Sequence, residues 1–318
     1  MEVITLQSGS SGNCVYVETD GVRLLFDAGI SGRQAQERLA QHGKDIHDVD
    51  ALIISHDHSD HTSCMGVYHR KFGLPIYCTP ATHTIVDRRK RLGRVSDVRH
   101  FDAGETLWFG QVAVETLSTP HDGADGVVFI IDNSRRRFGI LTDLGHVFDG
   151  LEAAVASLDA VLIESNYDPD MLAQGPYPPA LQERISGPGG HISNLEAARL
   201  LQRTDSSRLQ WACLAHLSDE NNAPDVALQT HRQLLGSEFP VSCADRFLAT
   251  DPLKVEDPCE GIVAVCDADD ETSSTDRCTD ADSQPSAPDN AQSSKRKSSR
   301  KRIAAGFSQL TFFDDACH

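Results

Sequence analysis

The stretch LIISHDHSDH, residues 52–61, decides how the rest of this sequence is interpreted. Its first half is a short run of β-branched and apolar residues, which is typical of a buried strand. Four side chains with metal-binding chemistry follow at once: His56, His58, Asp60 and His61. Alternate side chains at a strand end gather at one rim of a sheet, where imidazole and carboxylate groups suit Zn²⁺, Mn²⁺ or Fe²⁺. The alternative is a surface loop that is rich in His and Asp by chance.

Further polar side chains stand at the ends of other apolar runs. They are Asp27 after RLLF, His121 after VETLSTP, Asp143 after FGILT and His216 after WACLA. A single histidine after a strand is more often structural than a ligand. Four such residues, added to the dense motif, favour one shared metal centre.

The order of the apolar runs indicates the fold class. Strand-like runs such as VITL, CVYVE, VRLLF and VVFIID dominate the first half of the chain, and helical patterns separate some of them. One helix is expected from Ser31, and another begins at Ser193 or Asn194. No internal repeat is evident. Two sheets with helices outside them fit this order better than a regular βαβ alternation.

Composition divides the 318 residues into a domain and a tail. Residues 1–250 carry the apolar runs and predict one large domain. Residues 251–302 are expected to be a disordered linker, first acidic and then basic, and residues 303–318 a terminal peptide. Residues 251–290 hold twelve of the acidic side chains and only two basic ones, so the tail accounts for much of the formal net charge of −18.

The basic runs, the cysteines and the apolar segments indicate which partners and which location to expect for the protein. Basic runs at 88–94, 135–137 and 295–302 leave a nucleic-acid partner open despite the acidic total, although the last run is also explained as a solvated stretch. Nine cysteines without a CxxC pair predict reduced thiols. No secretory signal and no membrane span are expected. We therefore expect a cytoplasmic protein without a membrane partner.

These residues match a known family: the sequence resembles the metallo-β-lactamase fold, a four-layer αββα sandwich with a metal site along one sheet edge. The resemblance implies two divalent metal ions, Zn²⁺ or Mn²⁺. It implies that His56, His58 and His121 hold one metal, that Asp60, His61 and His216 hold the second, and that Asp143 bridges both. It also implies that Asp27 supports the ligands from outside.

Further blocks resemble the YycJ/WalJ branch of that family. They are SGSSGNC at 8–14, ESNYD at 164–168, GPYPPALQERI at 175–185, GGHISN at 189–194 and LAHLSDENN at 214–222. The branch is described as DNA exonucleases that act from the 5′ end. The resemblance covers residues 1–250 and implies a DNA exonuclease in repair or replication.

Several residues in these blocks are candidates for contact with the substrate. His191 in GGHIS resembles a histidine that touches the scissile phosphate or protonates the leaving oxygen in related nucleases; without the resemblance it is simply a residue next to a helix start. Ser8, Asn13 and Asn166 are candidate phosphate contacts, or they shape Gly-rich turns. We expect Asp60, Asp143 and His191 to act in catalysis, with Asp60 or Asp143 positioning the attacking hydroxide and His191 stabilising or protonating the reacting group.

Other activities share such a metal site. Thioester or ester hydrolysis, lactone hydrolysis and RNA processing are alternatives, and the SGN, ESN and GHISN blocks favour a nuclease over the small-molecule enzymes. An RNA-processing ribonuclease stays open because the phosphate chemistry is the same. A catalytically silent metal-binding scaffold is disfavoured by the complete ligand set.

The end of the chain suggests a partner. Gln309, Leu310, Thr311, Phe312 and Phe313 resemble the pentapeptide by which bacterial replication and repair proteins dock on the sliding clamp. The alternative is an apolar cluster that packs back on the domain. About 58 residues of flexible linker span roughly 40 Å, which leaves a tethered domain mobile beside clamp-bound DNA and near the nucleoid.

Overall fold

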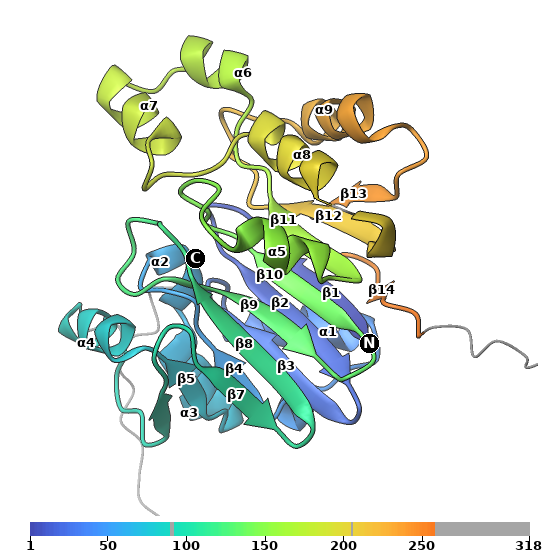
Figure 1. Ribbon diagram of the computed structural model, residues 1–318. Coiled ribbons are helices and arrows are strands. Elements are labelled where there is room, and N and C mark those ends of the chain that lie inside the picture. The colour runs from blue at the N-terminus through green and yellow to red at the C-terminus, as the bar shows by residue number, and fades with distance from the viewer. Residues whose placement is uncertain (90–91, 205, 258–318) are drawn as a thin grey trace, which may run out of the picture. The chain divides into compact units, whose positions relative to one another are not determined.

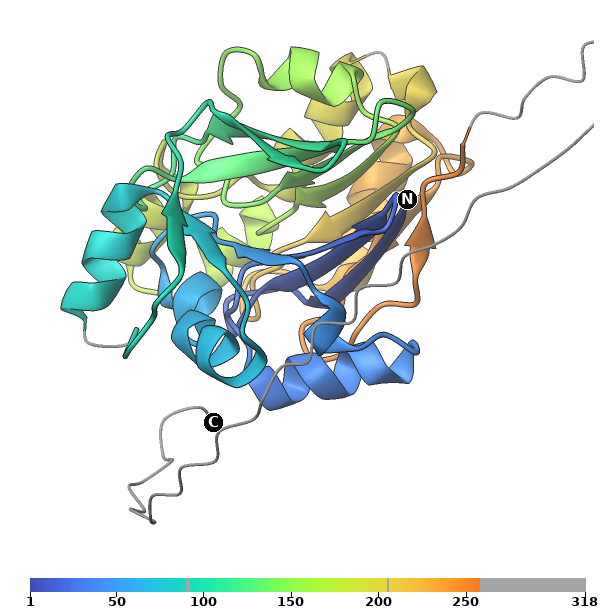
Figure 2. The same cartoon turned by 90° about the horizontal axis from the view of Figure 1, so that it is seen from below.

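The computed structural model describes residues 1–89, 92–204 and 206–257. Within these residues, two seven-stranded sheets pack face to face with helices outside each of them (Figure 1). Figure 2 shows the resulting order of helices, sheet, sheet and helices from top to bottom. The four-layer αββα sandwich that the resemblance implied is confirmed.

The first sheet has the strand order β14-β1-β2-β3-β4-β5-β6. From β3 to β6 its strands run parallel, and from β14 to β3 they run antiparallel. Its strands are β1 (Glu2–Gln7), β2 (Cys14–Thr19), β3 (Val22–Phe26), β4 (Ala51–Ile53), β5 (Ile76–Cys78), β6 (Val98–His100) and β14 (Leu253–Lys254). The helices of this half are α1 (Gly32–Gln41), η1 (Ile46–Asp48), α2 (Ser59–Thr62), α3 (Met65–Phe72) and α4 (Pro80–Arg88).

The second sheet has the order β13-β12-β11-β10-β9-β8-β7. Strands β10 to β13 run parallel and strands β7 to β10 antiparallel. Its strands are β7 (Thr106–Phe109), β8 (Val112–Ser118), β9 (Val127–Asp132), β10 (Arg137–Leu141), β11 (Ala160–Glu164), β12 (Trp211–Ala215) and β13 (Val241–Cys243). The helices of this half are α5 (Leu151–Ala156), α6 (Pro169–Gln174), α7 (Pro179–Ser186), α8 (Asn194–Arg203), η2 (Ser206–Arg208) and α9 (Pro224–Leu235).

Strand β11 shows why the central strands are apolar along their whole length. All five of its residues are buried. Ala160 and Leu162 face the core between the two sheets, whereas Val161 and Ile163 lie under the outer helices. A strand that is covered on both faces loses the polar alternation of a half-exposed strand. The conspicuous residue is therefore Glu164, a carboxylate at the end of this apolar run.

Helix α8 begins where the sequence predicted. Ser193 is its N-cap, and the Ser193 hydroxyl accepts a hydrogen bond from the Glu196 amide while the Glu196 carboxylate accepts one from the Ser193 amide. Such a cap contributes about 1 kcal/mol to helix stability. Because Ala197, Leu200 and Leu201 anchor the helix in the core, the cap also fixes the preceding segment that carries His191.

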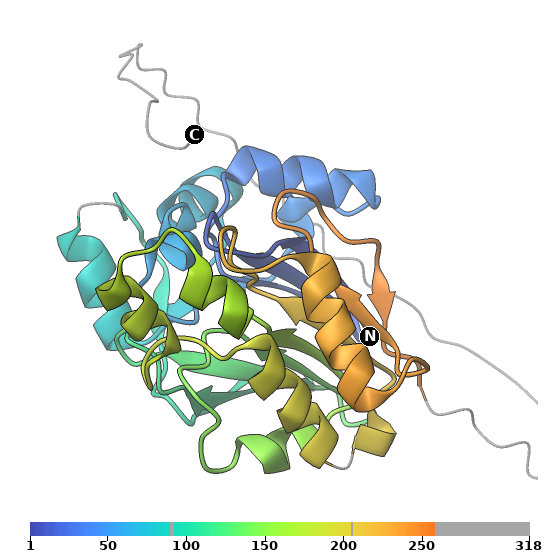
Figure 3. The ribbon, with the colours of Figure 1, turned by 90° about the horizontal axis from the view of Figure 1, so that it is seen from above.

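Helices α6 and α7 stand apart from the layers. Figure 1 shows them as a projection at the end of the sandwich, and Figure 3 looks down on this end. Helix α7 contains no buried residue, and α6 buries only Leu172. The projection therefore contributes little to the core, and its side chains are free to face a ligand.

The described domain continues beyond its predicted end. Strand β14 pairs with β1 through Lys254 and Glu2, so the sheet extends past the predicted domain end at residue 250. The predicted linker from residue 258 onward and the motif at 309–313 lie outside the described residues, and that part of the domain division stays a prediction. None of the helices in the described part of the chain is both long and apolar enough to cross a lipid bilayer.

Candidate metal centre

The predicted metal ligands follow the ends of strands in both sheets. His56 and His58 come after β4, His121 after β8, Asp143 after β10 and His216 after β12. Asp143 and His216 adopt the left-handed backbone region, with φ of 58° and 54°, as does Asp27 with φ of 63°. Non-glycine residues in this region are uncommon and cluster at functional sites. The chain thus turns sharply after these strands and brings their terminal side chains to one edge.

His56, His58 and His121 form one cluster. Each offers a ring nitrogen within 4.8 Å of those of the other two. The His121 Nε2 and His58 Nδ1 atoms are 3.2 Å apart. His121 is oriented by the bond between its Nδ1 and the Gly190 carbonyl oxygen, at 2.8 Å. This is the first ligand set that the sequence predicted, and three imidazoles at such spacing suit one divalent cation.

Asp60, His61 and His216 form a second cluster with the same spacing of ligand atoms. The Asp60 Oδ2 atom lies 3.3 Å from His61 Nε2 and 3.5 Å from His216 Nε2. Asp60 and His61 both belong to the short helix α2. The Asp60 side chain is partly exposed, whereas His61 and His216 are almost fully buried. The second predicted ligand set is therefore also assembled in one place.

Asp143 lies between the two clusters. Its Oδ1 atom is 3.6 Å from His121 Nε2 and its Oδ2 atom is 3.3 Å from His61 Nε2. The carboxylate therefore contacts a histidine from each predicted set. This position is the one that a bridging ligand requires.

The polar atoms at the centre fit a cation. Although they are buried, His56 Nε2 and Asp143 Oδ2 have no hydrogen-bond partner among the described residues. Leaving a buried polar atom without a partner costs about 1–3 kcal/mol. Coordination to a metal would satisfy both atoms, and imidazole nitrogen with carboxylate oxygen is a donor set that suits Zn²⁺ or Mn²⁺.

The electrostatics of the cluster agree with this fit. Burial alone would raise the pKa of the Asp143 carboxyl, but His216 and His61 outweigh burial and hold that pKa well below its usual range. Burial lowers the pKa of His56 well below its usual value. Asp143 is therefore ionised and His56 neutral, the protonation states that bind a cation. Burial alone would lower the pKa of His61, but Asp143 and Asp27 raise it well above its usual value, so a bound cation would displace a proton from this ring.

Asp27 and Ser55 support the ligands from behind. Asp27 Oδ2 is 2.7 Å from His61 Nδ1, and the Ser55 amide donates to Asp27 Oδ1 at 2.8 Å. The Ser55 hydroxyl lies 3.0 Å from His56 Nδ1. Because the Asp27 carboxylate accepts the Nδ1 proton of His61, Nε2 is the ring nitrogen that can bind a cation, and it lies 3.0 Å from the Asn13 side-chain amide. The sequence resemblance assigned this role to Asp27 but gave no role to Ser55.

The candidate phosphate contacts Ser8, Asn13 and Asn166 lie beneath the site and not on its open surface. All three are buried. The Asn13 side-chain amide is 3.2 Å from both the Gly9 carbonyl oxygen and Asp60 Oδ2. The Ser8 hydroxyl accepts from the His216 amide, and Asn166 Nδ2 donates to the His216 carbonyl oxygen. Phosphate binding by these residues stays a prediction, and their contacts favour a role in holding the ligand loops.

Gly29 shows how tightly the ligand loops are joined. A Cβ at this position would lie 1.7 Å from the Asp60 carbonyl oxygen and 2.6 Å from the Asn13 amide nitrogen. The Gly29 amide donates to the Asn13 carbonyl, and the Asn13 amide donates to the Asp60 carbonyl. Only glycine allows this approach, which fixes the loop of Asp60 against the loop after β1.

Glu164 is a site residue that the sequence analysis did not single out. It is fully buried at the end of β11, and its Oε1 atom is 2.7 Å from His191 Nδ1 and 3.3 Å from His216 Nδ1. Its Oε2 atom accepts from the Leu144 amide at 2.7 Å. The sequence pattern that could have identified Glu164 is the one that identified Asp143 and His216, namely an acidic or imidazole side chain at the end of an apolar run.

The Glu164 contact defines the orientation of His191. An ionised carboxylate only accepts hydrogen bonds, so His191 Nδ1 carries the proton and Nε2 is left free. Burial alone would raise the pKa of Glu164, but His191 and His216 hold that pKa below its usual value. The His191 ring lies 4.9 Å from the His121 ring and 5.2 Å from the His216 ring, measured between centroids.

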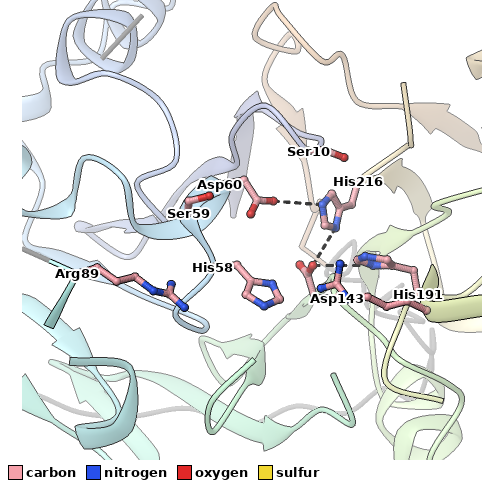
Figure 4. A pocket seen from close by; sticks show the side chains of 9 residues that line it. Ser10, His58, Ser59, Asp60, Arg89, Asp143, His191 and His216 are labelled. Atoms are coloured by element: carbon pink, nitrogen blue, oxygen red, sulfur yellow. Dashed lines mark ion pairs between the residues drawn. The ribbon is translucent and has the colours of Figure 1, made fainter. Parts of the chain in front are cut away.

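These side chains open into a pocket of about 440 Å³ (Figure 4). Asp60, Asp143 and His216 line it with His58 and His191. The other lining side chains are Ser10, Ser59, Arg89 and Arg184. In Figure 4, Asp60, His216, Asp143 and His191 follow one another around the pocket, and the ion pairs between them are drawn as dashed lines. An open pocket with candidate metal ligands on its floor is suited to catalysis.

Comparison with known proteins identifies the family. A model of the beta-lactamase superfamily domain matches residues 22–216, from β3 to the last predicted ligand. The exodeoxyribonuclease WalJ of Streptococcus pneumoniae serotype 2 (strain D39 / NCTC 7466) is 36% identical over 250 residues, which cover 78% of this chain and 93% of WalJ. The chain belongs to the metallo-β-lactamase superfamily, in its WalJ/YycJ branch.

Other members of the superfamily agree with this placement. The exodeoxyribonuclease YycJ of Bacillus anthracis is 34% identical over 250 residues, which cover 78% of this chain and 94% of YycJ. The crystal structure of the metallo-β-lactamase fold protein YhfI from Bacillus subtilis superposes with a TM-score of 0.61 at 17% identity, over 79% of this chain and 99% of YhfI. At that identity YhfI supports the fold alone. Membership of this superfamily implies divalent metal ions.

Proposed function

We propose that this protein is a divalent-metal-dependent exonuclease that hydrolyses phosphodiester bonds of DNA. The observation that carries the proposal is the similarity to WalJ and YycJ over 250 residues, combined with a complete set of candidate His and Asp ligands gathered at one pocket. Action from the 5′ end and a role in DNA repair or replication are the finer parts of the proposal. They rest on the resemblance to this branch.

Each ligand set is proposed to hold one cation. His56, His58 and His121 would bind the first, Asp60, His61 and His216 the second, and Asp143 would join both. Two divalent cations at such a site supply an activated water and neutralise the charge of a phosphodiester. Zn²⁺ and Mn²⁺ both suit these donors. Among the residues that line the pocket, Asp60 and Asp143 are the carboxylates that can accept a proton from water and orient it.

His191 is proposed to give a proton to the leaving oxygen. The Nδ1–H group of His191 is held by Glu164 at 2.7 Å, which fixes the orientation of the ring and leaves Nε2 as the nitrogen that can face the substrate. The side chain is 20% exposed and lines the pocket, so a substrate can reach it. Glu164 acts as a positioning residue because it orients His191 and does not itself line the pocket.

The role of His191 predicts a dependence on the leaving group. His191→Ala should lower the rate of DNA hydrolysis by about 10²-fold or more, the usual contribution of a general acid. The loss should be much smaller with bis(p-nitrophenyl) phosphate, since p-nitrophenolate leaves without a proton. Rates of the wild-type protein and the variant on both substrates measure the difference. Equal losses on both would contradict the proton-donor role.

The nuclease assignment itself is tested with end-labelled substrates. Purified protein is incubated with Mn²⁺ or Zn²⁺ and with 5′-phosphorylated DNA labelled at either end, beside a structured RNA. We expect products of one nucleotide from the 5′ end of DNA and little RNA cleavage. Faster cleavage of the RNA would replace the proposal by an RNA-processing function. Cleavage of neither substrate, with rapid hydrolysis of thioesters or other esters, would assign the site to small-molecule chemistry.

The predicted clamp motif at Gln309–Phe313 supplies a further part of the proposed function, recruitment to the sliding clamp at replicating DNA. Leucine and two phenylalanines on an extended peptide would fill an apolar pocket while glutamine fixes the register. A linker of this length gives an effective concentration in the mM range, which compensates a weak contact. The motif lies outside the described residues, and its support is the sequence pattern.

A pull-down on immobilised clamp tests this recruitment. The full chain should be retained, whereas a variant with Leu310→Ala, Phe312→Ala and Phe313→Ala should fall to background. Phe307→Ala removes an aromatic residue of the same tail outside the motif and serves as the matched control. Retention of the triple variant at the level of the control would rule out docking through this motif.

A further inference from the structure

Two arginines line the pocket beside the candidate ligands and have no part in the chemistry above. Arg89 and Arg184 provide the guanidinium groups among the nine lining side chains. Arg89 follows helix α4, and Arg184 lies on the projecting helix α7. They come from opposite halves of the sandwich, and only the fold brings them to the same pocket.

Arg89 is anchored to the loop that carries the first histidines. Its Nη1 donates to the Asp57 carbonyl oxygen at 2.7 Å, and its Nη2 lies 2.8 Å from Asp57 Oδ2. Asp57 is buried between His56 and His58 in sequence, and its Oδ1 also accepts from the Ala124 amide. The guanidinium group is therefore held at a fixed place beside the first ligand set.

Arg184 is anchored in the same way, from helix α7. Its Nε and Nη2 atoms lie 2.8 Å and 2.6 Å from Asp122 Oδ2. Asp122 follows His121, and its other oxygen, Oδ1, is 3.3 Å from His58 Nε2. Both arginines are thus tied to the histidine loops of the first ligand set, each by the carboxylate next to a candidate ligand.

Both anchored arginines keep donors for a ligand. Their side chains are 46% and 59% exposed, and neither Arg89 Nε nor Arg184 Nη1 has a partner among the described residues. On the side of Asp60 and His216, the remaining pocket residues are the uncharged Ser10 and Ser59. The two arginines of the pocket therefore lie on the side of the first ligand set, the one formed by His56, His58 and His121.

We propose that Arg89 and Arg184 form a second phosphate subsite, which binds the phosphate next to the one that is hydrolysed. The inference rests on the proposed function, because it requires a substrate with successive phosphodiester groups. Arginine suits this task, since its planar fork donates to two phosphate oxygens and stays charged at any working pH. Asp57 and Asp122 keep the guanidinium groups at the rim, where they meet the strand beside the metal centre.

The subsite predicts a loss that depends on the number of phosphates in the substrate. Arg89→Gln and Arg184→Gln are compared with the wild-type protein on a short single-stranded oligodeoxynucleotide and on bis(p-nitrophenyl) phosphate, which has one phosphate. Arg203→Gln is the matched control, because Arg203 is 55% exposed, is paired with Glu152 and does not line the pocket. All assays use the full chain with saturating Mn²⁺.

For each variant, kcat/KM on the oligonucleotide should fall at least tenfold more than kcat/KM on the single-phosphate substrate, mainly through KM. The slope of log kcat/KM against log salt concentration on the oligonucleotide should become shallower by about 0.7 for each arginine removed. Arg203→Gln should change neither quantity. Arg184→Lys should lie between the wild-type protein and Arg184→Gln, because it keeps the charge but loses the fork.

Two results would overturn the subsite. One is an unchanged kcat/KM and salt slope on the oligonucleotide in both glutamine variants. The other is an equal loss on both substrates, which would place the arginines on the reacting phosphate or in the integrity of the site. Failure of the proposed function looks different, because the wild-type protein itself would then not cleave the oligodeoxynucleotide.

Discussion

Asp60→Ala is expected to reduce DNA hydrolysis by about 10³-fold or more while the protein stays folded. The carboxylate is proposed to hold one cation and to orient the attacking water, and its loss removes several kcal/mol of stabilisation of the transition state. The fold should survive because Asp60 is 19% exposed on the short helix α2 and is absent from the core clusters. The Asp60 carbonyl that accepts from the Asn13 amide is unaffected by the change.

The measurement combines a nuclease assay with circular dichroism and thermal unfolding. Glu37→Ala is the matched control, since Glu37 is an exposed carboxylate of α1 that pairs with Arg33. His61→Ala should also abolish activity, but it is a less clean test. His61 is fully buried against Asp27, and its removal leaves a buried carboxylate without its partner. A folded Asp60→Ala protein with full nuclease activity would remove the mechanism.

Removal of the metal is expected to have an effect of similar size on activity and a clear effect on stability. Asp143 and Glu164 are buried carboxylates, and without cations only the surrounding histidines offset their charge. A ligand that binds the folded state at 100 times its Kd stabilises it by about 2.7 kcal/mol. For a domain of this size, that corresponds to an increase in Tm of roughly 5–10 °C.

Chelation followed by dialysis should therefore abolish nuclease activity and lower Tm, and Mn²⁺ or Zn²⁺ should restore both. Asp143→Asn keeps the shape of the side chain but removes its charge, so its Tm should respond much less to added metal. Differential scanning calorimetry with and without metal measures the shift. A protein that loses neither activity nor thermal stability after its metal has been removed would contradict the proposed centre.

The sequence was sufficient to find the site where polar residues end apolar strands. His56, Asp143 and His216 were found in this way, and the structure brings them together with the other predicted ligands. Glu164 is also a charged residue at the end of an apolar strand, β11, and the same pattern in the sequence identifies it. Chemistry at the carboxyl ends of strands is visible in sequence because the contrast between an apolar run and a charged side chain is local.

The parts that the sequence did not reveal depend on distant contacts. Arg89 lies in the basic run 88–94 and Arg184 in the block 175–185, but neither pattern shows that the two side chains line one pocket, which only the fold reveals. Ser8 and Asn13 are polar residues of a Gly-rich turn, a pattern that fits phosphate binding and loop support equally well. Only their burial and hydrogen bonds distinguish the two roles.

The strands that were not predicted are all short. Strands β5, β6, β13 and β14 have only two or three residues each, too few for a periodic pattern. Strand β14 forms through pairing with β1, from the opposite end of the described domain. Pairing between segments so far apart in the chain leaves no local signal in the sequence. For this reason the domain end was predicted at residue 250, before β14.

The most direct test of the central claim is the number of metal ions bound by each chain. Elemental analysis by plasma mass spectrometry, after dialysis against buffer with a small excess of Mn²⁺ or Zn²⁺, should give about two ions per chain, as expected for a paired-metal site. The same analysis of Asp143→Ala should show a clear loss, because that carboxylate contacts histidines of both sets. An active wild-type protein that contains no divalent metal would contradict the account.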